Sequence, residues 1–401
     1  MILRSHRWTT SRHTKSAQLE MLTWCLPCRG FAGGMNSLQK IPIKEGFELI
    51  NFYSKLQCVP CVQSVIQTSA TMNLTTGNGS TESSRCTMIS DTPSRIGKTI
   101  YLGLILAVSL VGNSLIVTIV YKTPTLRKPI NYFIANMAIS DLLYPIFWLP
   151  WHMSELHTNY SWLIGGKFGQ ALCKLLPFLG DVSTVVSIQN LILIAVDRFG
   201  AVVFPLRSPL IRSKLCTFFI LATWIVAVVV NLPYSFAFKV VEDSGEMWCC
   251  LEWEIAFGES LPFAKFIVAY YSLFIYLPVM LLVTLYSIIL IKLKTQTHPG
   301  EQSANNQQQW NRRNRNVLQM SIAIILVFVF CVLPPTVIIL IREYYWSSSW
   351  NIPRSFDKYS HVTFYINSAY CAANPIVCFI FSSNYRQGLK RFINCCTFAQ
   401  A

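Results

Sequence analysis

Asp197 and Arg198 stand side by side at the end of a long apolar run of the sequence. Charged residues are costly in a bilayer unless they lie at the water interface and have a task there. Arg198 follows Cys173 by 25 residues, which is about 37 Å of helix and enough to cross a membrane. The spacing predicts a helix with Cys173 at one membrane surface and the charged pair at the other. A chance Asp-Arg at a helix end is the alternative for the pair taken alone.

A second carboxylate, Asp141, lies within another apolar run. A charge in the middle of a membrane costs roughly 3 kcal/mol or more, so this residue needs a partner or a proton. Its position therefore marks a polar site inside the membrane.

The elements that must position these residues are long apolar blocks. The chain has 401 residues, and only 13% of them are charged, about half the share of a soluble domain. Seven blocks reach the roughly 20 residues of a spanning helix: 97–121, 130–152, 169–202, 215–238, 264–292, 318–341 and 361–383. The predicted fold is an all-α membrane protein, with a seven-transmembrane helix bundle over 96–383 and a short amphipathic eighth helix within 384–401.

Basic residues set the predicted orientation. The net charge is +15, and the basic residues flank apolar blocks, so topology and lipid head groups explain them better than nucleic acid does. They follow the first, third, fifth and seventh blocks: Lys122, Arg127, Lys128, Arg207, Arg212, Lys214, Lys292, Lys294, Arg312, Arg313, Arg315, Arg386, Lys390 and Arg391. Because positive loops are cytoplasmic, we predict a multi-pass plasma-membrane protein with its N-terminus extracellular.

Residues 1–95 predict an extracellular tail that is disordered and glycosylated. Asn73 and Asn78 open glycosylation sequons in it, and Asn159 opens a third in a loop on the same side. Disulfides or unstructured thiols explain its two CxxC pairs better than a metal site does, because their spacer is longer than zinc ribbons favour: Cys25, Cys28, Cys58 and Cys61. Translation from Met72 would remove both pairs and keep both tail sequons. No phosphate-loop, HExxH or GxSxG motif is present, so nothing predicts an enzyme.

Marked residues in the blocks and beside them form an ordered set along the chain. The set is Gly112-Asn113, Asp141, Trp162, Cys173, Asp197-Arg198-Phe199, Trp224, Pro278 with Tyr286, Phe328 with Cys331 and Pro334, and Asn374-Pro375. In order and spacing it resembles the rhodopsin-like (class A) G-protein-coupled receptors, over about 97–396. The resemblance implies a receptor that activates a heterotrimeric G protein and can bind arrestin, with coupling residues Asp197, Arg198, Phe199, Tyr286, Asn374 and Pro375.

The resemblance also implies that Asp141 is part of an allosteric sodium site. The oxygen-bearing side chains of Asn113, Ser187 and Asn374 would complete it, and a hard cation prefers oxygen ligands. The alternative is a protonated Asp141 in a hydrogen-bond network. No other cofactor is implied.

Two positions depart from the family pattern. Val332 stands where the family usually has Trp, and Cys378 stands where it has Tyr. The first change removes a bulky switch beneath the ligand, and the second removes a hydroxyl that helps to hold the active state. Both bear on how efficiently the receptor signals.

The ligand is indicated mainly by the second extracellular loop. Gly180 and Ser368 stand where the family's amine and retinal receptors carry Asp and Lys, although Asp181 is adjacent to the first. Acidic residues crowd the loop, and such charges attract a cationic ligand: Glu242, Asp243, Glu246, Glu252, Glu254 and Glu259. An ordinary solvated loop with an acidic bias is the alternative reading.

The run Cys250-Leu-Glu252-Trp253 is similar to one in the neuropeptide Y, neuropeptide FF and tachykinin receptor groups. By this resemblance we expect a Cys173–Cys250 disulfide, with Cys249 free, and a cationic, amidated neuropeptide bound by Asp181, Glu252 and Glu254. A receptor for a small molecule or lipid, or a non-signalling binding protein, is the alternative.

The eighth helix follows at Asn384. Its apolar residues fall on one face with basic residues at the borders, which predicts a helix lying on the membrane: Tyr385, Leu389, Phe392 and Ile393. Cys395 and Cys396 at its end resemble palmitoylation acceptors, with two unmodified thiols as the alternative.

Overall fold

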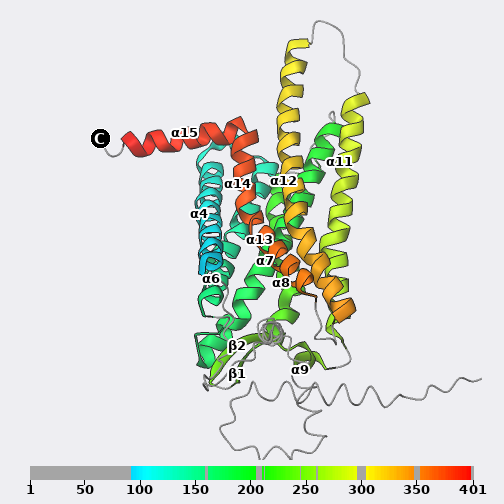
Figure 1. Cartoon of the computed structure of the whole chain (residues 1–401). Coiled ribbons are helices and arrows are strands. Elements are labelled where there is room, and N and C mark those ends of the chain that lie inside the picture. Colours follow the sequence, from blue (N-terminus) through cyan, green and yellow to red (C-terminus); the bar gives the residue numbers. More distant parts are fainter. Residues whose placement is uncertain are drawn as a thin grey trace, which may run out of the picture. The chain divides into compact units, whose positions relative to one another are not determined.

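The fold is taken from a computed structural model. It describes residues 92–158, 161–204, 210–211, 213–243, 245–258, 261–295, 304–346 and 353–398. These residues lie in one compact unit of the chain, which is a bundle of long helices (Figure 1).

Seven spans form the bundle, as the sequence predicts. The first four are α4 (Thr92–Lys122); α5 (Pro129–Asp141) continued through a π-helical turn (Tyr144–Trp148) into α6 (Leu149–Thr158); α7 (Gly166–Val203); and α8 (Ser213–Ala237). The others are α10 (Phe263–Tyr271) continued through a second π-helical turn (Ser272–Tyr276) into α11 (Leu277–Thr295); α12 (Ala304–Trp346); and α13 (Arg354–Ser368) with α14 (Tyr370–Phe381). Six spans are long and apolar enough on their own, and the seventh is the pair α13 and α14, bent by 43°.

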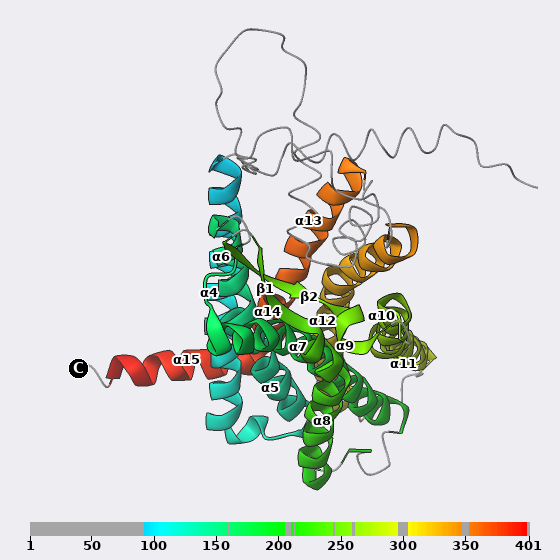
Figure 2. The same ribbon diagram turned by 90° about the horizontal axis from the view of Figure 1, so that it is seen from below.

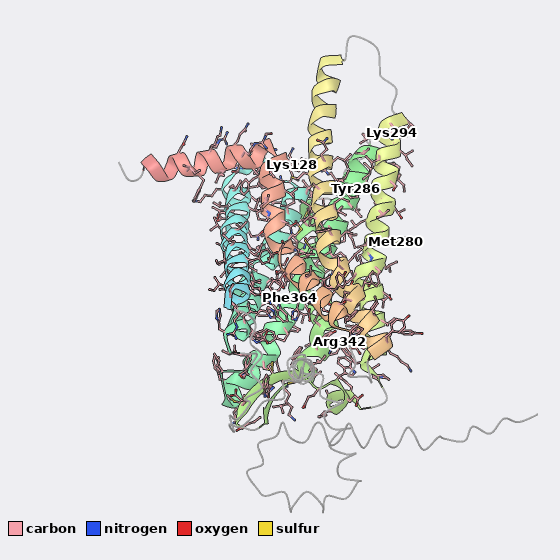
Figure 3. All side chains as sticks on the ribbon, in the orientation of Figure 1. Lys128, Met280, Tyr286, Lys294, Arg342 and Phe364 are labelled. Carbon is pink, nitrogen blue, oxygen red and sulfur yellow. A yellow bond between two sulfur atoms is a disulfide. The ribbon has the colours of Figure 1, made fainter. Side chains whose placement is uncertain are left out.

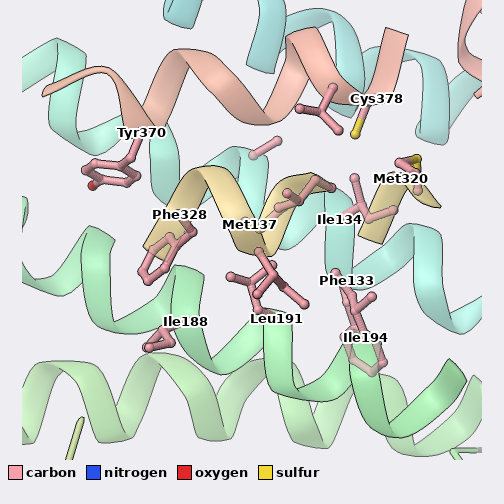
Figure 4. Packing of buried hydrophobic residues seen from close by; sticks show 14 of the residues in the cluster. Phe133, Ile134, Met137, Ile188, Leu191, Ile194, Met320, Phe328, Tyr370 and Cys378 are labelled. Carbon is pink, nitrogen blue, oxygen red and sulfur yellow. The ribbon is translucent and has the colours of Figure 1, made fainter. Parts of the chain in front are cut away.

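The third span, α7, lies at the centre and contacts α5, α8, α11 and α12. Its inward positions pack in a shared core with residues of its neighbours; Figure 4 shows Ile188, Leu191 and Ile194 beside Phe133 and Met137 of α5. Because α7 is held on several sides, its polar side chains are fixed in position relative to most of the bundle.

The outward surface of the helices is apolar. Leu104 of α4, Phe218 of α8 and Leu326 of α12 are each more than 60% exposed. Large exposed apolar areas of this kind mark a surface that is covered in use, and a bilayer covers the surface of spanning helices.

One end of the bundle carries a β-hairpin, which we call the hairpin end. Strands β1 (Phe238–Asp243) and β2 (Glu246–Leu251) pair antiparallel, and the short α9 (Trp253–Phe257) follows. Gly245 in the turn has a φ of 83°, a conformation that glycine adopts without strain. Figure 2, viewed from this end, shows the hairpin lying across the helix ends. The sequence did not predict these strands.

The opposite end carries α15 (Ser383–Phe398), which runs crosswise to the spans, past α4 and beyond the bundle, in the place predicted for the eighth helix (Figure 1). A short 3-10 helix (Pro124–Leu126) joins the first two spans at this α15 end. Figure 3 places Lys128 and Lys294 at the α15 end and Arg342 toward the hairpin end.

Candidate functional site

Asp141 is the last residue of α5, and its side chain is fully buried. The Ser187 hydroxyl of α7 donates to its Oδ1 at 2.6 Å, and the Asn374 amide of α14 donates to its Oδ2. Three spans therefore meet at one carboxylate, and two of the three residues expected around Asp141, Ser187 and Asn374, bind it. Each donor offsets part of the cost of burying the carboxylate.

Asn113 has no hydrogen bond to Asp141 in the described part of the chain, and its amide binds neighbouring backbone instead. Pro375 has no N–H, so the carbonyl of Cys371, four residues earlier, loses its partner within α14. The Asn113 amide donates to that carbonyl at 2.9 Å, and the Ser109 hydroxyl donates at 3.2 Å. Asn113 Oδ1 is buried and has no hydrogen-bond partner within the described residues. It is the kind of orphaned oxygen that a cation or a water molecule satisfies.

Arg198 lies near the α15 end of α7 and pairs with the adjacent Asp197, with Nε at 3.1 Å from Oδ2. Phe199 packs at the edge of the core beside them. Tyr286 of α11 is 6% exposed and lies within electrostatic reach of Arg198. Four of the predicted coupling residues, Asp197, Arg198, Phe199 and Tyr286, thus lie toward this end, whereas Asn374 binds Asp141 and Pro375 packs against Gly112 deeper in the bundle. The ion pair holds the arginine along its own helix.

A disulfide joins the hairpin to α7, but it is not the predicted one. Cys173 is bonded to Cys249, with 5.6 Å between their Cα atoms. Cys250 is disulfide-bonded as well. The expectation of a Cys173–Cys250 bond with a free Cys249 is therefore wrong.

The register of the hairpin explains the difference. Successive residues of a strand point to opposite faces, so only one of two adjacent cysteines can face α7. Gln170, one turn before Cys173, donates to the Phe238 carbonyl at 3.3 Å and accepts from the Val240 N–H at 3.0 Å. Val240 pairs with Cys249 across the hairpin, so this anchoring brings Cys249 to Cys173.

Two carboxylates face the interior between the hairpin and the buried Asp141 group. Asp181 of α7 lies within electrostatic reach of the Tyr270 and Tyr271 hydroxyls, and Glu343 of α12 also reaches Tyr271. Neither carboxylate has an ion-pair or hydrogen-bond partner in the part of the chain that the structure describes. The sequence reasoning included Asp181 but missed Glu343. Its signal was an acidic residue just two positions beyond the sixth apolar block.

The loop carboxylates are partly used within the loop. Glu252 is 6% exposed, and its Oε2 lies 3.7 Å from Nζ of Lys239. Glu246 accepts a hydrogen bond from the Ser161 hydroxyl at 2.6 Å. Glu242 and Glu254 are exposed. The side chains of Asp243 and Glu259 lie outside the described residues.

The sequence of this bundle matches a known protein family. The model of the rhodopsin family of seven-transmembrane receptors matches residues 112–377. The chain belongs to this family. It is therefore a receptor and not an enzyme.

The receptor is similar to several neuropeptide receptors. It is 28% identical to the RYamide receptor of Drosophila melanogaster over 71% of this chain and 61% of that protein. It is 28% identical to the Allatostatin-A receptor of Bombyx mori, over 74% and 79% of the two chains, and 27% identical to Neuropeptide FF receptor 2 of Rattus norvegicus, over 73% and 71%. The receptor thus spans about three-fifths of the length of the first of these relatives.

The two departures from the family pattern are buried in this receptor. Val332 is 2% exposed on α12, and Cys378 is 1% exposed on α14. Neither side chain supplies the aromatic ring that the family pattern has at its position. An aromatic residue that the sequence reasoning did not single out, Tyr370, lies in the same core as both (Figure 4).

The receptor's α15 is held against the bundle by contacts of its own side chains. Burial raises the pKa of the Tyr385 phenol, which stays protonated and donates to Asn131 Oδ1 at 3.2 Å. Nζ of Lys122 lies 5.3 Å from the centre of the Phe392 ring. α15 therefore has docking contacts of its own on the bundle.

Several predicted modification sites lie outside the described residues. These are the sequons at Asn73, Asn78 and Asn159 and the CxxC pairs of the tail. α15 extends past Cys395 and Cys396, but their side chains are not described.

Proposed function

We propose that this receptor binds an extracellular peptide at the hairpin end and activates a heterotrimeric G protein at the α15 end. The observation that carries the proposal is the separation of two groups along α7. Asp181 and the Cys173 disulfide lie toward one end, and the Arg198–Asp197 pair lies near the other. A ligand and a transducer at these ends communicate only if the bundle has two arrangements that each partner favours differently.

The orientation follows from the charge at the α15 end. Lys128 and Lys294 lie there (Figure 3), and positive loops face the cytoplasm. This charge supports an orientation in the plasma membrane with the hairpin end outside. Arrestin would meet the same cytoplasmic end, and anionic lipids would meet its basic residues.

A peptide ligand is supported by the relatives, which are receptors named for RYamide, allatostatin-A and neuropeptide FF. A cationic group in that peptide is supported by Asp181 and Glu343, which both approach Tyr271 in the interior. A guanidinium carries five donors in a fork that matches carboxylates, so an arginine side chain suits this pair better than an ammonium does. An amidated C-terminus would avoid placing a like charge beside them.

The buried Asp141 group suits a sodium ion. Asp141, Ser187 and Asn374 already meet there, and the unpartnered Oδ1 of Asn113 lies on the adjoining span. These are the oxygen ligands that a hard cation prefers. The ion's part would be to neutralise a carboxylate inside the membrane without a proton.

The direct test is nucleotide exchange on purified heterotrimeric G proteins by the receptor in lipid nanodiscs. The probes are a library of amidated peptides with and without an internal arginine. We expect exchange with arginine-containing peptides, and its loss in the Arg198→Ala variant with peptide binding retained. Binding without exchange in the parent would indicate a non-signalling binding protein. Activation by neutral lipids or small molecules instead would refute the peptide assignment.

A further inference from the structure

The seventh span changes direction at a single residue. α13 ends at Ser368, α14 begins at Tyr370, and the two helices are bent by 43°. Tyr370 is therefore the first residue of the half that carries Asn374 and Pro375. Although it is large and polar, it is only 1% exposed.

The Tyr370 hydroxyl connects this half to the central helix. It shares a 2.9 Å hydrogen bond with the Ser183 hydroxyl, and the Thr184 hydroxyl donates to it at 3.4 Å. Both partners belong to α7. They lie between Asp181, toward the proposed ligand, and Ser187, which binds Asp141. The bond thus sits between the two functional groups of α7.

The Tyr370 ring extends the connection to two further spans. Its edge faces Tyr144 of the second span at 5.3 Å and Phe328 of α12 at 6.1 Å between ring centres. Figure 4 shows Phe328 and Tyr370 side by side between their helices. These aromatic contacts link α14 to the second span and to α12.

The next residue holds the same point from the other side. The Cys371 carbonyl, released by Pro375, accepts hydrogen bonds from Asn113 and Ser109 of α4. The start of α14 is therefore fixed between α4 and α7 by two adjacent residues. The bonds from α4 go to a carbonyl that has no donor within its own helix. The bond to α7 joins two hydroxyl groups, and rotation of either side chain can break it.

We propose that Tyr370 is a positioning residue, a latch whose hydroxyl bond to Ser183 holds α14 in the resting arrangement of the receptor. A ligand that displaces α7 near Asp181 would break the bond. α14 would then move about the bend, while the bond from Asn113 to the Cys371 carbonyl keeps the first turn of α14 in place. This inference rests on the proposed function, because it names the element through which the ligand site acts on the coupling end.

The test uses Tyr370→Phe, which keeps the ring and removes the hydroxyl, and Ser183→Ala, which removes its partner. One neutral hydrogen bond shifts a two-state equilibrium by about fivefold, so each variant should raise ligand-free nucleotide exchange by about that factor. The double variant should do no more than Tyr370→Phe alone, because that change already removes the bond to Ser183. The matched control is Tyr101→Phe, which removes a 2.7 Å bond from α4 to the Tyr365 carbonyl in α13, on the hairpin side of the bend. It should leave exchange unchanged.

A second readout does not depend on a G protein. Cys378 lies on α14 and is 1% exposed, so its alkylation by N-ethylmaleimide, measured by peptide mass spectrometry, reports movement of that helix. Buried Cys216 on α8 is the internal control. Both latch variants should label Cys378 several-fold faster and Cys216 at the parent rate.

The outcomes separate the latch from the proposed function. Unchanged Cys378 labelling in Tyr370→Phe, or additive effects in the double variant, would overturn the latch. If both variants label Cys378 faster than the parent but neither they nor the parent drive nucleotide exchange, the latch is supported and G-protein coupling is refuted. Faster labelling with parental exchange in an active receptor would overturn the transmission role.

Discussion

Gly112 of the first span lies close against Pro375 of the seventh, and replacing it tests the packing that holds the buried group together. A Cβ at this position would lie 2.6 Å from Cγ and 2.7 Å from Cβ of Pro375. Ordinary contacts begin at 3.4 Å, so Gly112→Ala requires α4 and α14 to separate by nearly an ångström. Both atoms that it meets belong to a proline ring, which cannot rotate away.

The magnitude follows from a matched change on the same helix. A Cβ added to Gly103 of α4 would meet no atom within 4 Å, so Gly103→Ala adds only the helix preference of alanine, about 0.5–1 kcal/mol. Gly112→Ala gains the same preference and adds the overpacking, about 1–3 kcal/mol. Since the preference cancels, the difference between the variants in free energy of unfolding should be about 1–3 kcal/mol.

Thermal unfolding of the purified variants, followed by tryptophan fluorescence in detergent micelles, measures this difference. We expect the midpoint of Gly112→Ala to fall below that of the parent and that of Gly103→Ala to equal or exceed it. Equal midpoints for the two variants would refute the close contact between Gly112 and Pro375. Saturation binding on the parent and both variants would show whether the shift reaches the ligand site.

Three further predictions concern the two ends and the buried group. Cys249→Ser should weaken ligand binding as strongly as Cys173→Ser, because both remove one bond; a full effect of only one change would contradict that pairing. Asp141→Asn should abolish any sodium dependence of agonist affinity, since an ion that favours the resting state opposes the agonist by linkage; a mutant with parental sodium dependence would exclude the site. Glu343→Gln should speed dissociation of an arginine peptide, costing roughly 2 kcal/mol or more, whereas Glu242→Gln on the exposed loop should only slow association, and equal effects would argue against an interior cation site.

The seven spans were predictable because bilayer thickness imposes a length on every apolar run. Each described span overlaps its predicted block, and the membrane-facing apolar residues carry the signal. Asp141 and Arg198 were predictable for a related reason. A charge within such a run is so costly that its mere presence points to a site.

The partner of Cys173 was not predictable, because the adjacent Cys249 and Cys250 differ only in which face of the strand each side chain points to. The choice depends on Gln170 of α7, which binds β1 and sets the register of a hairpin that the sequence pattern did not show. Tyr370 escaped notice for a similar reason. A tyrosine in an apolar block is ordinary, and its meaning comes from Ser183 on a helix almost two hundred residues earlier in the chain.

The attachment of α15 divides that helix into two parts with different physical supports. Tyr385 binds Asn131, and Gly388 lies so close to Ile119 that a Cβ there would be 2.5 Å from Cγ2 of the isoleucine. The first turns are thus docked by protein contacts that do not need a lipid. Toward the far end Ile393 is half exposed. Acyl chains on Cys395 and Cys396 would therefore regulate how deeply the free end sits in the membrane, and a receptor stripped of them would keep the helix in place.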